Sequence, residues 1–172
     1  RRTADDAGTD MIFTVARTSE RLYLRFRWRD ATRDVQTLKD QFRDGVAAQF
    51  SLGDNSTSFM MGTGPETPVN IWYWHPDGNR VESLGAGGFG STTRLDEQPV
   101  TAASQYQDRG GDANEWVVVM SRPLSVDGEY QVNLEQDTVP VALAVWQGAK
   151  GERDGFKSVT FGWLNLQMKG AS

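Results

Sequence analysis

Cysteine is absent from this 172-residue chain. The chain therefore cannot form disulfides, thiolate metal sites or a thiol nucleophile, and it lacks the C-x-x-C-H motif that attaches haem covalently. Histidine is nearly absent, since His75 is the only one. This excludes a metal site built from several histidines, and a Ser-His-Asp triad would have to use His75. Basic charge is also limited, because 18 Lys and Arg against 23 Asp and Glu give a net charge of −5. We therefore expect no nucleic-acid partner.

Long apolar runs are also missing, so we expect no membrane span. The hydrophobic share of 38% indicates a modest core, yet six Trp and eight Phe are too many for a disordered chain. The length fits one domain, and no linker or internal repeat divides it. We therefore expect a single domain over residues 1–172. The start at Arg1-Arg2-Thr3 shows no signal peptide, which leads us to expect a mature or trimmed chain.

The clearest pattern is alternation of apolar and polar residues. Residues 22–28 place Leu22, Leu24, Phe26 and Trp28 on one face and mainly arginine on the other. This predicts a half-buried antiparallel strand, with residues 11–16 as its hairpin partner. The polar segment 30–44 is either a short helix or a loop. Turn-rich segments separate the further strands that we expect, at residues 46–52, 69–75, 116–121, 130–134, 139–146 and 158–168. The pattern predicts an all-β antiparallel β-sandwich with short helical turns in its loops.

Met60 and Met61 are two of only five methionines and lie beside a glycine-rich turn. Methionine commonly fills gaps in a core. Its thioether can also bind a soft or redox metal, chiefly haem iron. Because adjacent residues of a strand point to opposite faces, at most one of the pair should be a ligand.

Residues 70–75 read Asn-Ile-Trp-Tyr-Trp-His, with Trp72 and Trp74 on one face and Ile71, Tyr73 and His75 on the other. This segment could be a core strand, a platform on which sugars stack, or a wall against a flat macrocycle. Lys157 precedes the last predicted strand. It could be a solvated edge residue. In an apolar pocket, however, it would be neutral, and a neutral amine can coordinate iron.

Four segments occur in a characteristic order: residues 42–50, residues 59–62, residues 68–74, and residues 141–148 followed by 155–159 and Trp163. Together they resemble the haem-b-binding gamma subunits of the ethylbenzene dehydrogenase type. That family also serves dimethylsulfide dehydrogenase, selenate reductase and chlorate reductase, which are periplasmic molybdenum enzymes. The resemblance covers about Leu22 to Leu166. The methionine and Trp-Tyr-Trp segments look closest to the chlorate and selenate reductases.

The resemblance implies a β-sandwich similar to a carbohydrate-binding module and one non-covalent haem b per chain. By motif, the axial ligands are Lys157 and Met61, with Met60 as the second choice. Asn70, Trp72 and Trp74 are expected as further cofactor contacts. The lack of cysteine agrees with this reading, because a b-type haem needs no thioether link to the chain. His75 departs from the expected pattern and stays open as a competing ligand.

The function that the resemblance implies is electron transfer without catalysis by this chain alone. Its partners would be a soluble c-type cytochrome and an iron–sulfur beta subunit, which connects to the molybdenum alpha subunit. We expect a periplasmic location. The alternative is a carbohydrate-binding module with the same fold, in which Trp72, Tyr73 and Trp74 form a sugar platform and Met60, Met61 and Lys157 are ordinary packing and surface residues.

Overall fold

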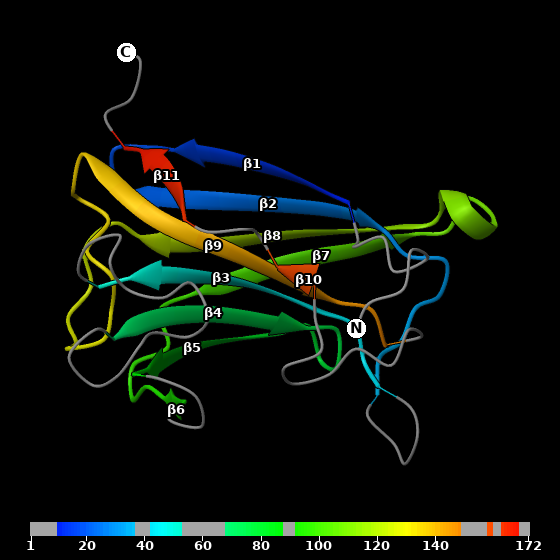
Figure 1. Cartoon of the computed structure of the whole chain (residues 1–172), viewed down its shortest axis with the longest axis horizontal. Helices are drawn as coiled ribbons and strands as arrows, with labels where there is room; N and C mark the ends of the chain where they lie inside the picture. Colours follow the sequence, from blue (N-terminus) through cyan, green and yellow to red (C-terminus); the bar gives the residue numbers. More distant parts are fainter. Residues whose placement is uncertain are drawn as a thin grey trace.

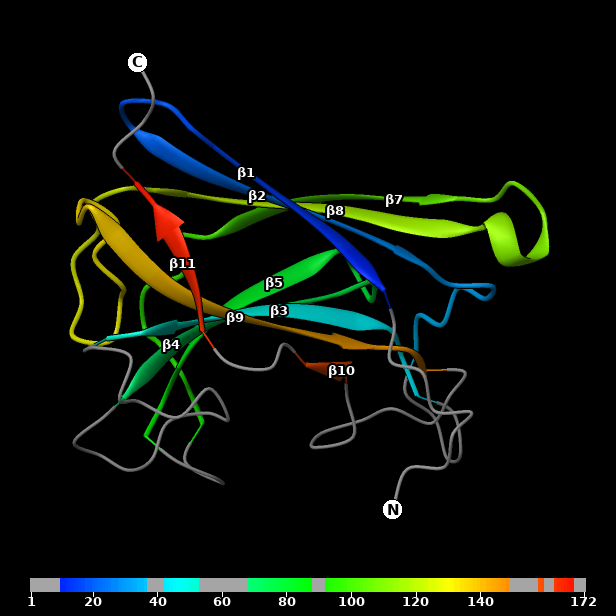
Figure 2. The ribbon, with the colours of Figure 1, turned by 45° about the horizontal axis from the view of Figure 1, so that its top comes forward.

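A computed structural model describes residues 10–36, 42–52, 68–87, 92–148, 158–159 and 163–168, with only the backbone at 158–159. Two antiparallel β-sheets pack face to face (Figures 1 and 2). Within these residues, regular helix is limited to one 3-10 turn, Gly111–Ala113. The predicted all-β sandwich is therefore confirmed. No helix in the described part of the chain is long and apolar enough to cross a membrane.

The smaller sheet has four strands in the order β1-β2-β8-β7. Its strands are β1 (Met11–Arg17), β2 (Arg21–Arg29), β7 (Thr101–Gln107) and β8 (Glu115–Pro123). The predicted hairpin joins β1 to β2, and Thr18 closes its turn by accepting the Arg21 N–H at 3.0 Å. The alternating residues of β2 are buried against the larger sheet, as the sequence pattern predicted.

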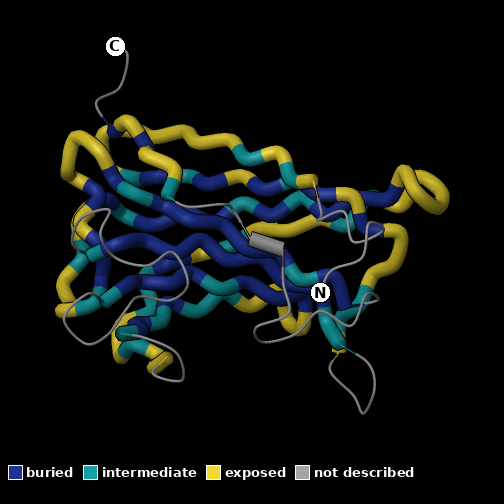
Figure 3. The backbone as a smooth tube through the Cα atoms, viewed as in Figure 1, coloured by how far each residue is buried: buried dark blue, intermediate teal, exposed yellow. Residues whose placement is uncertain are grey.

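The larger sheet has seven strands in the order β10-β9-β3-β4-β5-β6, with β11 also paired to β9. Its strands are β3 (Gly45–Ser51), β4 (Val69–His75), β5 (Arg80–Ala86), β6 (Thr93–Arg94), β9 (Thr138–Trp146), β10 (Ser158–Val159) and β11 (Leu164–Gln167). The central strand β3 is buried at every position (Figure 3). Both faces of this sheet are therefore shielded from solvent along β3.

Some strand predictions were wrong. Residues 130–134 form an irregular loop, in which the N–H of Val132 bonds to the Asn70 side chain at 3.1 Å and not to a neighbouring strand. The single strand expected over 158–168 is two strands, β10 and β11. Strands β5, β6 and β7 were missed; β7 is largely polar, and only Ala102 and Tyr106 of this strand pack against the core. The described part of segment 30–44 is a loop, and residues 37–41 lie outside the described residues.

Tryptophans dominate the core between the sheets. Trp28, Trp74 and Trp116 are at most 2% exposed, and the Trp74 and Trp116 rings meet edge to face with centroids 5.1 Å apart. The indole N–H of Trp74 donates to Asn79 Oδ1 at 2.8 Å, in a turn where Asn79 has a positive φ of 46°. Asn79 also donates to the Ala102 carbonyl oxygen on β7 at 3.1 Å. This turn therefore ties the two sheets together.

Candidate functional site

Strand β4 separates the candidate site residues onto two faces. Asn70, Trp72 and Trp74 point into the space between the sheets, where each is 0% exposed. Ile71 and Tyr73 point to the opposite face and contribute to a second hydrophobic cluster. The alternation expected from the sequence is therefore present. Trp72 and Trp74 occupy the sandwich core, packed among residues of both sheets.

The side-chain amide of Asn70 is fully bonded within the protein. It donates to Ser83 Oγ and to the Leu84 carbonyl oxygen, both at 3.0 Å. Its oxygen accepts the indole N–H of Trp72 and the backbone N–H of Val132, both at 3.1 Å. These four bonds use the two donors and both lone pairs of the amide. Asn70 thus joins β4, β5 and the loop at 130–134.

Replacing Asn70 by Ala should lower the free energy of unfolding by roughly 3 kcal/mol, because it leaves buried N–H groups of Trp72 and Val132 without an acceptor. Chemical denaturation followed by circular dichroism measures the change. Asn165→Ala is the control, because Asn165 is exposed and its side chain makes no hydrogen bond among the described residues, and it should change stability by less than about 0.5 kcal/mol. Unchanged stability together with an altered visible spectrum would instead assign Asn70 to a cofactor.

The same burial counts against the sugar platform. Stacking requires exposed ring faces, but Trp72 and Trp74 are 0% exposed, and Tyr73 points to the other side of the sheet. These three aromatics therefore cannot present one stacking surface to a sugar.

The outward side of the larger sheet carries a second apolar surface, which we call the outer apolar face. Small side chains lie near its centre, since Ala47 of β3 is opposite Ala144 of β9, and Ala142, two positions further along, is opposite Gln49. The remaining members of the face are Val69, Ile71, Tyr73, Leu84, Ala86, Trp146 and Trp163. Small central residues leave a low-relief surface, and the rings of Tyr73 and Trp146 meet edge to face at 5.3 Å beside it. Such a surface suits contact with a flat apolar group.

Met60, Met61 and Lys157, the predicted ligands, lie outside the described residues. The described residues that flank them can be placed. The methionine segment leaves β3 after Leu52 and enters β4 at Pro68, and the Leu52 N–H donates to the Pro68 carbonyl oxygen at 3.2 Å. Lys157 directly precedes β10, whose Ser158 pairs with Val145 of β9. Both segments that contain predicted ligands are therefore attached to the sheet that carries the outer apolar face.

His75 ends β4 on the outward side and is only 4% exposed. Its ring lies 5.7 Å from that of Tyr73, and its Nδ1 atom is buried without a hydrogen-bond partner. Burial lowers the pKa of His75, and the positive charge of Arg43 lowers it further. The imidazole is therefore neutral at neutral pH, the form that can bind a metal. The question of His75 as a competing ligand stays a prediction.

Sequence reasoning missed the outer apolar face because it concentrated on the tryptophan side of β4. The signal was present in the sequence as the alanines at 47, 142 and 144. Their meaning depends on the register, which places β3 beside β9.

One protein family and several known proteins match this sequence. Residues 87–158 match the protein family described as ethylbenzene dehydrogenase. The dimethylsulfide dehydrogenase gamma subunit of Rhodovulum sulfidophilum is 59% identical over 160 residues, which cover 92% of this chain and 60% of that protein. The chlorate reductase gamma subunit of Ideonella dechloratans is 39% identical over 154 residues, covering 88% of this chain and 62% of that protein. A candidate respiratory nitrate reductase heme subunit of Haloferax mediterranei is 40% identical over 147 residues, which cover 84% of this chain and 51% of that protein.

A solved structure of a candidate carbohydrate-binding protein from Bacteroides uniformis aligns with a TM-score of 0.49 and 10% identity, over 88% of this chain and 67% of that one. The sequence matches confirm the predicted resemblance to gamma subunits of the ethylbenzene dehydrogenase type. This chain is a relative of the gamma subunits of dimethylsulfide dehydrogenase and chlorate reductase. The motifs favoured the chlorate and selenate reductases, but the identity is higher to the dimethylsulfide dehydrogenase subunit. The chain spans between half and two thirds of the length of these relatives.

Proposed function

We propose that this protein is the haem b electron-transfer subunit of a periplasmic molybdenum oxidoreductase. In this role it passes electrons between a soluble c-type cytochrome and an iron–sulfur beta subunit, which connects to the molybdenum alpha subunit. The ordered sequence motifs support the proposal, as do the relatives named as gamma and heme subunits.

The outer apolar face is the observation that carries the proposal. Its central side chains, such as Ala47 and Ala142, are small, so a flat ring packed over them could approach the sheet closely. Apolar contact of this kind is what a macrocycle held without covalent bonds requires. A bound haem would supply one-electron redox chemistry, with a potential set by its axial ligands and by burial. The residues of the outer apolar face fit such a group.

The described residues that flank the predicted ligands lie at opposite ends of the outer apolar face. Lys157 precedes Ser158 and is therefore near Trp146, which pairs with Gly45 at the start of β3. The methionine segment departs beyond Ser51, at the other end of β3. Seven residues of strand span roughly 20 Å at about 3.3 Å per residue. A group bound by both segments would therefore lie along the face, between them.

The chain would not be catalytic alone in this role. A methionine and a lysine would occupy both axial positions of the iron, so no position would remain for a substrate. The chain's own residues would hold the group, shield it from water through the outer apolar face, and fix its orientation relative to the partner subunits.

The test is to purify the protein from haem-replete cells and record its visible spectrum. We expect a sharp Soret band, a pyridine haemochrome typical of haem b, and one haem per chain. Extraction with acidified organic solvent should remove the pigment, because no cysteine is available to retain it. A colourless protein, or pigment that stays with the polypeptide, would contradict the proposal. A colourless protein that binds glycans would instead support the carbohydrate-binding alternative.

A further inference from the structure

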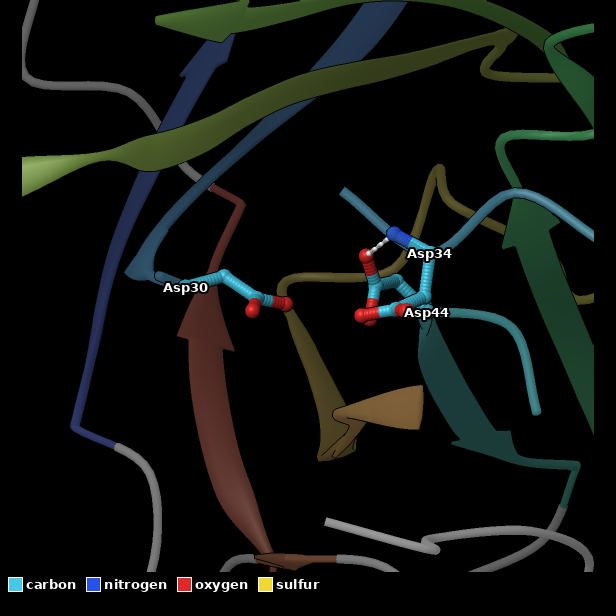
Figure 4. Close-up of side chains that lie close together, drawn as sticks. All are labelled: Asp30, Asp34 and Asp44. Carbon is cyan, nitrogen blue, oxygen red and sulfur yellow. Dashed lines mark hydrogen bonds between the residues drawn. The ribbon is translucent and has the colours of Figure 1, made fainter. Parts of the chain in front are cut away.

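Three aspartates converge at the end of the sandwich where β2 ends and β3 begins. Asp30 directly follows β2, Asp44 directly precedes β3, and Asp34 lies in the loop between them. Each offers a carboxylate oxygen, and these atoms all lie within 4.8 Å of one another. Figure 4 shows the three side chains side by side, with Asp30 extended toward the other two. Asp30 is 2% and Asp44 is 0% exposed, and Asp34 is half-buried.

Asp44 is held rigidly by hydrogen bonds from three directions. It accepts the Asp34 N–H at 2.8 Å, the Trp116 indole N–H at 2.9 Å and the Gly148 N–H at 2.9 Å. Gly148 must be glycine here, because a Cβ atom would collide with the Phe42 carbonyl oxygen. These contacts fix the Asp44 carboxylate before any ligand binds.

Asp30 has an oxygen that the protein leaves unused. One of its oxygens accepts the Thr32 N–H at 3.3 Å, but Oδ2 is buried without a hydrogen-bond partner. The ion pairs among the described residues involve other carboxylates, so none of them neutralises this group. Burial and the neighbouring Asp44 carboxylate raise the pKa of Asp30 to about 8. Without a cation this carboxyl is therefore protonated at neutral pH, and a bound cation would displace that proton.

We propose that Asp30, Asp34 and Asp44 bind a hard divalent cation, with Ca²⁺ as the best fit. The cluster offers only oxygen atoms, which are the ligands that Ca²⁺ and Mg²⁺ prefer. Mg²⁺ demands near-ideal octahedral geometry and usually keeps several of its waters, whereas Ca²⁺ accepts about six to eight oxygens in a flexible geometry. Buried carboxylates with positions fixed by the fold, such as Asp30 and Asp44, therefore suit Ca²⁺ better.

The cation would stabilise the junction of the two sheets. Asp30 directly follows a strand of the smaller sheet, and Asp44 directly precedes a strand of the larger one. A shared ion links them directly. Through the Asp44 bond to Gly148 it also supports the point where the chain leaves β9. Removal of the ion should therefore lower the thermal stability of the whole domain.

The experiment uses the purified protein after dialysis against EDTA, titrated with CaCl₂ and separately with MgCl₂ by isothermal calorimetry. We expect one Ca²⁺ per chain and at least about tenfold weaker Mg²⁺ binding. Asp30→Asn and Asp34→Asn should each weaken Ca²⁺ binding at least about tenfold, while the exposed Asp127→Asn should leave it unchanged. Added Ca²⁺ should raise the melting temperature of the wild type but not that of the Asp30→Asn, Asp34→Asn double variant.

The proposal is overturned if the EDTA-treated wild type takes up no Ca²⁺, or if the double variant binds it as tightly as the wild type. Asp34→Asn is the safer single variant, because Asp34 is half-buried and its side chain is bonded only to the Thr32 hydroxyl among the described contacts. A melting temperature that responds to pH but not to Ca²⁺ would show that a proton, and not a cation, neutralises Asp30. These outcomes do not depend on whether haem is bound.

Discussion

Replacing Lys157 by Ala is expected to remove most of the haem from the purified protein and to abolish the low-spin spectrum of the remainder. The predicted lysine ligand binds through its amine lone pair, and the remaining thioether ligand is the weaker of the two. The ratio of Soret to protein absorbance measures retention. Lys150→Ala is the matched control, because Lys150 lies in the same charged segment but outside the family motif.

Ligation by lysine also predicts how haem affinity changes with pH. A free lysine amine has a pKa of about 10.4, so at neutral pH the iron must displace a proton to bind it. The bound state then holds fewer protons than the free state, and haem affinity falls as the pH falls. Haem affinity measured at several pH values should decline toward acid for the wild type and much less for Lys157→Ala. Equal haem retention by Lys157→Ala and Lys150→Ala would contradict the lysine assignment.

Local alternation predicted the strands whose two faces differ. In residues 22–28 every second side chain is apolar, so only one orientation buries Leu22, Phe26 and Trp28, and the structure adopts it. The same reasoning divided β4 correctly between its two faces. It could not say which face is core and which is available to a ligand, because Trp72 on one side and Ile71 on the other are both apolar.

Long-range pairing explains what the sequence could not predict. The outer apolar face depends on the pairing of Ala47 with Ala144, which are far apart in the chain. Residues 130–134 resemble a strand, but their backbone bonds to scattered partners, with the Val132 N–H on the Asn70 side chain and the Leu134 N–H on the Leu124 carbonyl oxygen. Asp30 and Asp44 meet only because the strands they flank belong to opposing sheets. The spacing of residues within one segment does not reveal which distant residues lie side by side in the fold.

Replacing Met61 by Ala is expected to lower the reduction potential by on the order of 100 mV, a fraction of the roughly 0.8 V over which axial ligands tune haem. A thioether ligand raises the potential, so its loss favours the oxidised form. More haem should be retained than in Lys157→Ala, because the lysine ligand remains. Spectroelectrochemical titration measures the potential, and Met60→Ala is the matched control from the adjacent position.

His75 remains open as a competing ligand once Met61 is removed. Its imidazole is neutral, buried and unbonded at Nδ1, but it lies beside the start of β3, at the end of the sheet nearer Lys157 than the methionine segment. If His75 nevertheless replaces the thioether, the spectrum of Met61→Ala stays low-spin, and adding His75→Gln makes it high-spin. If it does not, Met61→Ala is high-spin by itself. If only Met60→Ala disturbs the spectrum and potential, Met60 is the ligand. If Met60→Ala, Met61→Ala and Lys157→Ala all leave the visible spectrum and the reduction potential unchanged, the Met–Lys ligation is wrong. The haem, if present, is then bound by other residues.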